Sequence, residues 1–405
     1  MRRYCSKVFI IIWTLRFVLP VSAELKGLEG LRAVPIMANE SMPKPIMGVG
    51  VDHDGTVYVT ETIRQQREEI SLIQSPFLHR HCMAFDTTEA KRKWILKNYA
   101  SNIIGRQGVK DYNKDGKIDV QDLSVRSEKI YTLQDSDGDG VYDKATLFAE
   151  GFNDLLTGCA HSVAPIGGHV YATIIPDLWK LTDSDGDGVA DRRESLAHGF
   201  APHIGYGNHD LHSILQGYDG KLYWSMGDRG ANVLSKEGKR VSNPHSGCIL
   251  RCNPDGSEFE VFAHGLRNCQ YFDFDNYGNL FAVDHDADFQ GERERLVYLP
   301  EGSDSGWRMY YQYRNTTHVR ASREDLYNPW LAEKMWVPFH AGQPSHILPA
   351  IENSWNAPAS FSFQPGTALG GAYKDHFLLG CKGNIRAFKM VADGAGFKRE
   401  GDHVP

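Results

Sequence analysis

The sequence lacks an excess of basic residues. Its 44 lysines and arginines are outnumbered by 51 aspartates and glutamates, which gives a formal net charge of −7. A protein that binds nucleic acid needs a basic face to neutralise the phosphates. The charge balance therefore predicts that nucleic acid is not a partner. The hydrophobic share of 41% is ordinary for a globular chain that can bury a large core.

Cysteine is also scarce. The 405 residues include seven cysteines, too few for a disulfide framework in a chain of this length. No Cys-x-x-Cys-His segment is present, so the chain carries no attachment site for a c-type haem. Cys248 and Cys252 fall in one expected strand, roughly 13 Å apart, which is too far for them to pair with each other.

Long hydrophobic runs are absent except near the N-terminus. Basic residues at 2 and 3 precede an apolar stretch, and Val21-Ser22-Ala23 forms a small-residue cleavage site. This order is typical of a secretory signal peptide. Arg16 interrupts the stretch, which falls short of the ~20 apolar residues that a membrane anchor needs. We therefore expect residues 1–23 to be a signal peptide and the protein to be exported to the periplasm or cell envelope.

Short strands joined by Asp/Gly turns recur along the chain. Alternating apolar residues flank such a turn in residues 49–60, 214–225 and 272–283, with looser versions in 163–173 and 361–380. Each segment predicts a β-hairpin. A longer repeat relates residues 130–152 to residues 178–200, with an offset of 48 residues.

Repeats of roughly 40–50 residues that contain hairpins are typical of β-propeller blades. The sequence thus predicts an all-β propeller over residues 24–405, and a β-sandwich is the weaker alternative. Residues 64–128 break the pattern, and residues 88–98 have helical spacing. We expect a small helical, EF-hand-like insertion there, between two blades. The C-terminal residues show no closing strand, so either the chain is a fragment or its N-terminal segment completes the last blade.

Three acidic segments follow the EF-hand pattern D-x-[DN]-x-[DN]-G. Alternating carboxylates in one loop repel each other unless a cation lies between them, and this spacing suits Ca²⁺ better than Mg²⁺. Because the second and third loops join strands, we expect structural calcium sites. The expected ligands are Asp111, Asn113, Asp115, Lys117 and Asp122 in the first loop, Asp135, Asp137, Asp139, Val141 and Asp143 in the second, and Asp183, Asp185, Asp187, Val189, Asp191 and Glu194 in the third.

Four further phrases carry polar residues suited to catalysis. They are Gly207-Asn-His209 before a strand that ends in Gly-Asp228-Arg-Gly, then Gly-Leu-Arg267-Asn268-Cys-Gln270, then Asp-His285-Asp, and finally Gly302-Ser-Asp-Ser-Gly-Trp307. Their order resembles the soluble quinoprotein glucose/sorbosone dehydrogenases. The paired acidic loops and the phrase Gly-Asn-His-Asp-Leu-His are still more similar to the "membrane-bound dehydrogenase" propellers of planctomycetes. The resemblance covers residues 40 to 400.

The resemblance implies a six-bladed propeller, incomplete at its C-terminus if the chain is a fragment, that holds pyrroloquinoline quinone (PQQ) over its channel. His209 would be the general base for a sugar or alcohol hydroxyl, and Asp228 would orient it. Arg267 and Asn268 would stabilise the charge on the reduced quinone. Gln270 and His285 would be cofactor contacts. The electron acceptor would be a c-type cytochrome, either separate or on a C-terminal part.

The chain departs from that family in three places. Asp286-Ala287 stands where a Gly-Pro pair binds the family's catalytic calcium, Ser305 replaces a tyrosine, and Val233 replaces a cofactor-contacting glutamine. Two other functions therefore remain open. One is a metal-dependent lactonase, and the other is a non-catalytic, calcium-stabilised propeller that binds a glycan or a protein. In the latter case His209, Asp228 and Arg267 would be structural.

Overall fold

The computed structural model of the chain describes residues 28–31, 43, 45–63, 70, 78–99, 109–205, 208–285, 294–309, 350–353, 358, 360–381 and 384–403. The expected signal peptide lies outside this part of the chain. None of the helices within it is both long and apolar enough to cross a bilayer.

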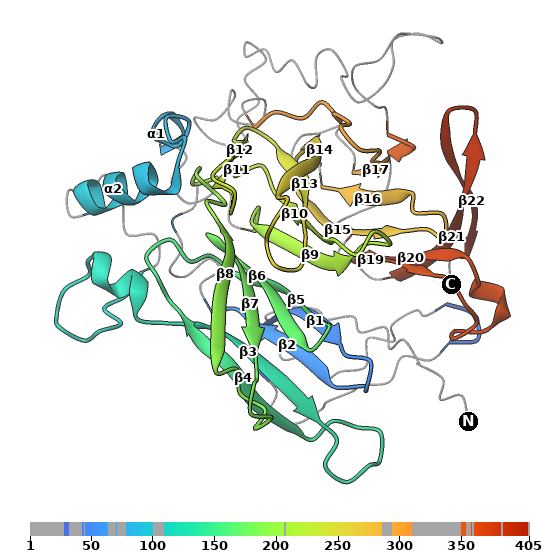
Figure 1. The fold of residues 1–405 in the computed structure, drawn as a ribbon, viewed down its shortest axis with the longest axis horizontal. Coiled ribbons are helices and arrows are strands. Elements are labelled where there is room, and N and C mark those ends of the chain that lie inside the picture. The colour runs from blue at the N-terminus through green and yellow to red at the C-terminus, as the bar shows by residue number, and fades with distance from the viewer. Residues whose placement is uncertain are drawn as a thin grey trace.

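The described chain forms five four-stranded antiparallel sheets (Figure 1). The first strand of each sheet contacts the first strand of the next, as neighbouring blades of a propeller do. This confirms the all-β propeller, and a sixth four-stranded sheet is not among the described residues. The sheets are β1 (Ile46–Val51), β2 (Val57–Glu61), β3 (Glu128–Gln134) and β4 (Lys144–Phe152); β5 (Ala160–Ile166), β6 (His169–Ile174), β7 (Asp177–Thr182) and β8 (Arg192–His198); β9 (Leu211–Gln216), β10 (Leu222–Met226), β13 (Gly247–Cys252) and β14 (Glu260–Leu266); β15 (Cys269–Phe274), β16 (Leu280–Asp284), β17 (Arg295–Tyr298) and β18 (Glu352–Asn353); and β19 (Ser360–Gln364), β20 (His376–Cys381), β21 (Asn384–Asp393) and β22 (Gly396–His403).

The five expected hairpins are the first two strands of the five sheets. Local turn chemistry explains why they could be predicted. In three of them an aspartate side chain accepts a hydrogen bond from the backbone N–H two residues later, as Asp54, Asp219 and Asp275 do. The 48-residue repeat is also confirmed, because its two copies are the third and fourth strands of neighbouring sheets, β3–β4 and β7–β8.

The expected helix is α2 (Thr88–Asn98), which the side chain of Thr87 caps by accepting a hydrogen bond from Ala90 N. The insertion that contains it was predicted to lie between two blades, and this prediction is wrong. It joins β2 to β3, which pair as neighbours in one sheet, and therefore lies within a blade. The short elements α1 (His79–Cys82) and η3 (Val120–Ser124) belong to the same insertion, and η4 (Gly371–Tyr373) precedes β20.

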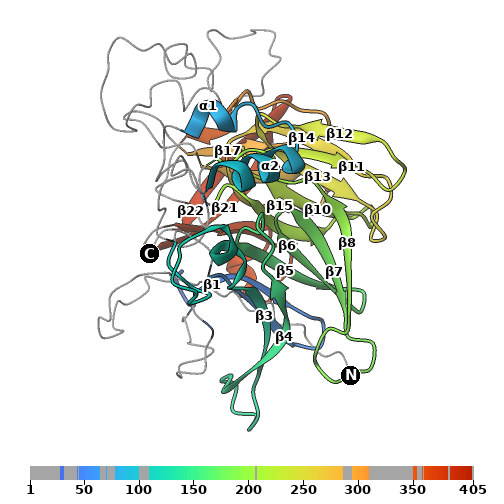
Figure 2. The ribbon, with the colours of Figure 1, turned by 90° about the vertical axis from the view of Figure 1, so that its left-hand side faces the viewer.

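The insertion covers one rim of the propeller. Figures 1 and 2 place α1 and α2 beside the hairpin β11 (Ala231–Leu234) and β12 (Arg240–Asn243). Asn232 of this hairpin donates a hydrogen bond to the carbonyl of Asp86. Ile95 of α2 shares an apolar cluster with Ile204 and Met309, which belong to two different propeller loops. The insertion is thus packed against the loop that precedes His209 and against the segment that follows Trp307.

The segment before β1 packs on the last sheet. Leu28 is buried with Leu378 and Ala387, and the Tyr373 hydroxyl donates a 2.7 Å hydrogen bond to the carbonyl of Glu29. The described residues 28–31 contain no strand, and the last sheet draws its four strands from β19 to β22. Residues 28–31 therefore pack on the last sheet without adding a strand to it. The other described residues before β1, 43 and 45, also lie outside the strands of the last sheet.

We expect the folded protein to lose stability in acid because of His203, which lies beneath the insertion. It is fully buried, its Nδ1 hydrogen-bonds the carbonyl of Cys82 at 2.7 Å, and burial lowers its pKa to about 4. The unfolded chain binds this proton below about pH 6.5, whereas the folded chain does so only near pH 4. Stability should therefore fall as the pH drops through this window, by up to about 3 kcal/mol. Urea unfolding at several pH values measures the effect, and His203→Gln should flatten the dependence.

Candidate active site

His209 and Asp228 form a buried pair between the first two strands of the third sheet. His209 lies just before β9, Asp228 lies just after β10, and His209 Nδ1 is 2.7 Å from Asp228 Oδ1. Their close approach requires the glycine at 227, because a Cβ there would lie 2.6 Å from the carbonyl carbon of His209. With Nδ1 as the donor to the carboxylate, Nε2 carries the lone pair and is the ring atom that can accept a proton.

The second oxygen of Asp228 is also bonded. Oδ2 accepts a 3.1 Å hydrogen bond from Trp307 Nε1, and the Arg267 guanidinium lies over the Trp307 ring, 5.8 Å from its centroid. Burial raises the pKa of Asp228, but His209, Arg267 and the Trp307 hydrogen bond together bring it below the ordinary value. Asp228 is therefore held as a carboxylate.

A second buried carboxylate positions Arg267 and Asn268. Asp284, at the end of β16, accepts hydrogen bonds from the backbone N–H groups of both residues at 2.8–3.1 Å. Its charge is balanced by Arg295, whose guanidinium lies 2.5 Å from Asp284 Oδ2 and also bonds the carbonyl of Ser305. Asp284 and Arg295 have exposed side-chain fractions of 0% and 1%. The arginine–asparagine segment is thus fixed from below by an ion pair in the core.

The remaining predicted cofactor contacts lie nearby. Arg267 Nη1 bonds the carbonyl of His285 at 2.8 Å, and burial lowers the pKa of His285 to about 4. Gln270 lies two positions after Asn268 on β15 and is half-buried. The site thus joins His209, Asp228, Arg267, Asn268 and His285 through a few contacts. Val233 and Ser305 are buried, and Asp286-Ala287 lies outside the described residues.

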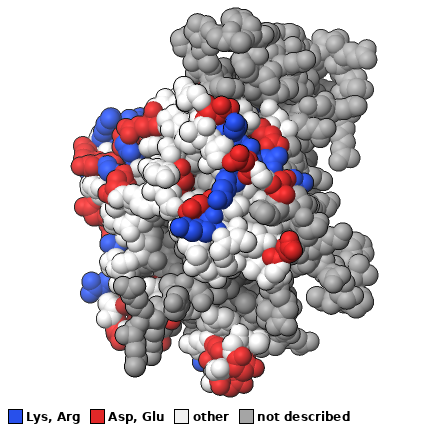
Figure 3. Space-filling view, turned by 90° about the vertical axis from the view of Figure 1, so that its right-hand side faces the viewer, with Lys and Arg blue, Asp and Glu red and all other residues white. Residues whose placement is uncertain are grey.

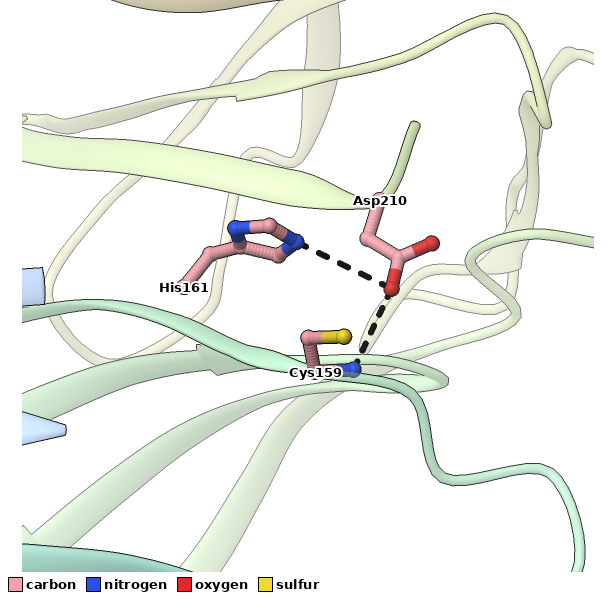
Figure 4. Close-up of side chains that lie close together, drawn as sticks. All are labelled: Cys159, His161 and Asp210. Carbon is pink, nitrogen blue, oxygen red and sulfur yellow. Dashed lines mark hydrogen bonds and ion pairs between the residues drawn. The ribbon is translucent and has the colours of Figure 1, made fainter. Parts of the chain in front are cut away.

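Sequence reasoning missed a neighbouring cluster. Asp210, next to His209, forms a buried ion pair with Arg229 and accepts a 3.2 Å hydrogen bond from Cys159 N (Figure 4). His161 Nε2 lies 3.9 Å from Asp210 Oδ2, and its ring packs edge-on against His212 at 4.1 Å. The alternation of Cys159 and His161 at the start of a strand was the one local signal. Their partner Asp210 lies 51 residues further along the chain.

His212 links this cluster to the predicted site. Its Nε2 is 2.9 Å from the Asn268 side-chain oxygen, and burial keeps its pKa well below the usual range. The first strands of the second and third sheets, β5 and β9, therefore bring two groups of polar residues together at one end of the channel.

The second and third acidic loops have the same geometry. Carboxylate oxygens of Asp135, Asp137 and Asp139 lie within 4.8 Å of one another, as do those of Asp183, Asp185 and Asp187. Backbone N–H groups of the loop glycines bond the first aspartate of each set, and Asp143 and Asp191 accept bonds from Ser136 and Ser184. The three carboxylates of each trio could bind one cation. The third loop also contacts the neighbouring sheet, because Ala190 N bonds the carbonyl of Phe148 at 2.8 Å.

Other predicted ligands are placed differently. Glu194 lies on β8, where it forms a 3.7 Å ion pair with Lys236. In the first loop Asp111 accepts bonds from Asp115 N and Gly116 N, and Asn113 also bonds Asp115 N. The buried Asp122 carboxylate accepts bonds from three backbone N–H groups. Lys117, Val141 and Val189, expected to contribute backbone carbonyls, each follow the glycine of their loop.

The face shown in Figure 3 carries charged side chains of both signs. Basic and acidic side chains are interleaved there, and acidic side chains gather at its lower tip, where Figure 1 places the β3–β4 loop.

The fold and site define a β-propeller with a buried histidine–aspartate pair at one end of its channel. Among solved structures, the chain is similar to an oxidoreductase described as a glucose dehydrogenase from Thermus thermophilus, with 15% identity and a TM-score of 0.50, covering 93% of this chain and 87% of that one. It is also similar to the PQQ-bound aldose sugar dehydrogenase of Streptomyces coelicolor, with 14% identity, a TM-score of 0.49 and coverage of 93% and 84%. The first likeness shows that the two chains share their fold.

A family model matches residues 28–403, and the chain belongs to that family, which is described as a domain of unknown function, DUF7133. No curated protein matches the chain.

Proposed function

We propose that the protein is an exported, PQQ-dependent dehydrogenase that oxidises a sugar or another alcohol. The observation that carries the proposal is the buried His209–Asp228 pair, with Arg267 and Asn268 fixed beside it by Asp284. A base next to a cation and an amide suits the removal of a proton and a hydride from a carbinol, because the base takes the proton and the other two groups stabilise the negative charge on a bound hydride acceptor.

The residues at the site fit a quinone cofactor. Arg267 and Asn268 provide a cationic donor and an amide donor, and Gln270 and His285 lie beside them. The side-chain oxygen of Asn208, adjacent to the base, is buried and has no hydrogen-bond partner among the described residues. A hydrogen-bond donor of a bound ligand would satisfy it. When bound, PQQ would supply the two-electron acceptor for the hydride.

The protein's own residues account for the proton. His209 Nε2 would take the proton of the substrate hydroxyl while the C–H bond of the same carbon breaks. The Asp228 carboxylate would stabilise the resulting imidazolium through the 2.7 Å bond to Nδ1. Trp307 and Arg267 keep that carboxylate charged and oriented. Arg267 and Asn268 would then face the negative charge that develops on the acceptor.

Reconstitution with PQQ and Ca²⁺ tests the proposal. We expect the purified protein to bind PQQ at micromolar concentrations and to reduce a dye when given a suitable member of a panel of sugars and alcohols. The matched control is the protein without PQQ. Absence of binding and of any spectral change would contradict the dehydrogenase. If the protein is inactive and chelation still lowers its stability, the result would favour the hypothesis of a non-catalytic, calcium-stabilised propeller.

Structural calcium is a further part of the proposal. It is supported by the two aspartate trios, and the third loop bonds β4 of the neighbouring sheet. Ca²⁺ at a hundred times its Kd should raise the free energy of unfolding by about 2.7 kcal/mol per site. The double substitution Asp183→Asn/Asp187→Asn should remove one site's share, whereas Asp393→Asn, at the exposed end of β21, should not. Thermal unfolding with Ca²⁺, Mg²⁺ and chelator measures this, and equal stability in all three would contradict it.

The electron acceptor is proposed to be a c-type cytochrome, by the same resemblance that implies the planctomycete-type propeller. Because the sequence contains no haem attachment motif, the haem would belong to another chain or to a part of the protein beyond these residues. Stopped-flow reduction of an added c-type cytochrome by the substrate-reduced protein is the direct measurement.

A further inference from the structure

The geometry points to a second, unassigned site, where Cys159, His161 and Asp210 bind one divalent transition-metal ion of the Zn²⁺ class. Cys159 lies just before β5, His161 lies on β5, and Asp210 lies just before β9 (Figure 4). All three side chains are buried. The site is separate from the second and third acidic loops, which lie at the β3–β4 and β7–β8 turns.

The three donors are close enough to share an ion. The thiol, an imidazole nitrogen and a carboxylate oxygen lie within 4.8 Å of one another, and His161 Nε2 is 3.9 Å from Asp210 Oδ2. A tetrahedral ion with bonds of about 2.0–2.3 Å separates its ligands by roughly 3.3–3.8 Å. Binding would therefore need side-chain shifts smaller than a bond length, without movement of the strands.

An independent observation is the unmet hydrogen-bonding capacity of His161. Its Nε2 is buried without a hydrogen-bond partner among the described residues, and Figure 4 shows this nitrogen directed at the Asp210 carboxylate. The residue is 4% exposed. Leaving a buried polar atom unsatisfied costs about 1–3 kcal/mol. A metal ion between His161 and Asp210 removes that cost.

The Asp210 carboxylate is held in the orientation that such a site requires. Oδ1 pairs with Arg229, so Oδ2 is directed at His161 and Cys159. Outer partners of this kind orient metal-ligating carboxylates in known sites. Residue 158 must be glycine for the same reason, because a Cβ there would lie 2.5 Å from Asp210 Oδ2.

The donor types select the ion. A thiolate with an imidazole and a carboxylate suits Zn²⁺ and related ions, whereas Ca²⁺ prefers oxygen ligands only. Three protein ligands leave a fourth position of the tetrahedron for water or another ligand. The His212 ring packs against His161 and bonds Asn268, so this metal site would be one residue away from the dehydrogenase site.

Metal titration of the full chain tests the inference without a quinone or a substrate, so its outcome is independent of the proposed activity. After chelation, Co²⁺ should bind with one equivalent that shows a thiolate charge-transfer band and intense tetrahedral d–d bands. Zn²⁺ should displace this Co²⁺, and excess Ca²⁺ should not. Zn²⁺ binding should be roughly 100-fold weaker in Cys159→Ser and in His161→Gln, with the Cys159→Ser protein also losing the charge-transfer band.

Cys252→Ser is the matched control, because Cys252 is equally buried but lies outside the cluster. It should retain the cobalt spectrum. The inference is overturned if the chelated protein shows no cobalt–thiolate band, or if Cys159→Ser and Cys252→Ser give the same spectrum. If Cys159→Ser fails to fold, the comparison of His161→Gln with the parent protein decides by the same criteria.

Discussion

Replacement of His209 by asparagine is expected to lower kcat by about 10²–10⁴-fold, the usual contribution of a general base. The buried imidazole is oriented by its 2.7 Å bond to Asp228, and asparagine provides no group that can accept the substrate proton. Its amide can still donate to Asp228, so the fold should persist. Steady-state dye reduction by the PQQ-loaded protein measures the loss.

Two comparisons make this result specific to the base. The control His169→Asn changes a half-buried histidine on β6 that contacts Thr182, and it should leave kcat unchanged. Asp228→Asn should retain PQQ binding but lower kcat, because the imidazolium that forms during the reaction loses its carboxylate. Wild-type turnover in His209→Asn would exclude this histidine as the base.

Asp284→Ala is expected to cost about 3–5 kcal/mol of unfolding free energy, since it leaves the buried Arg295 charge without its partner. The aspartate also accepts hydrogen bonds from the backbone N–H groups of Arg267 and Asn268. The substitution should therefore weaken PQQ binding as well as lower the stability. Urea unfolding and PQQ titration measure the two effects.

The matched control is Glu150→Gln at the partly exposed pair with Lys129, whose charged atoms are 3.5 Å apart. Exposed pairs of this kind contribute about 1 kcal/mol or less. If Asp284→Ala were as stable as Glu150→Gln, the Asp284–Arg295 pair would not hold the site.

The repeated hairpins and the helix at residues 88–98 could be predicted because their signals are local. In the hairpin turns an aspartate side chain accepts a hydrogen bond from the backbone N–H two residues later, and Thr87 caps the helix. Both contacts span only a few residues of the chain. The location of the insertion within a blade could not be predicted from such local signals. Which strands flank it depends on the pairing of β2 with β3, across more than sixty residues of intervening sequence.

The candidate site shows the same division. The pairing of His209 with Asp228 was expected from a motif and is present, because one hairpin carries both residues. Asp284 was missed as the anchor of Arg267, and so was the Cys159–His161–Asp210 cluster, because their partners come from different strands. Alternation along a strand shows which residues share a face, but not what lies opposite them.

The hydrogen bond from Tyr373 to Glu29 spans 344 residues of sequence. Because closing so long a loop carries a large entropic cost, contacts of this kind slow folding and form late. The segment before β1 can therefore pack on the last sheet only after almost the whole chain has been synthesised. Until that contact forms, the edges of the sheets are exposed to other chains, and a chaperone would shorten this interval or shield the edges.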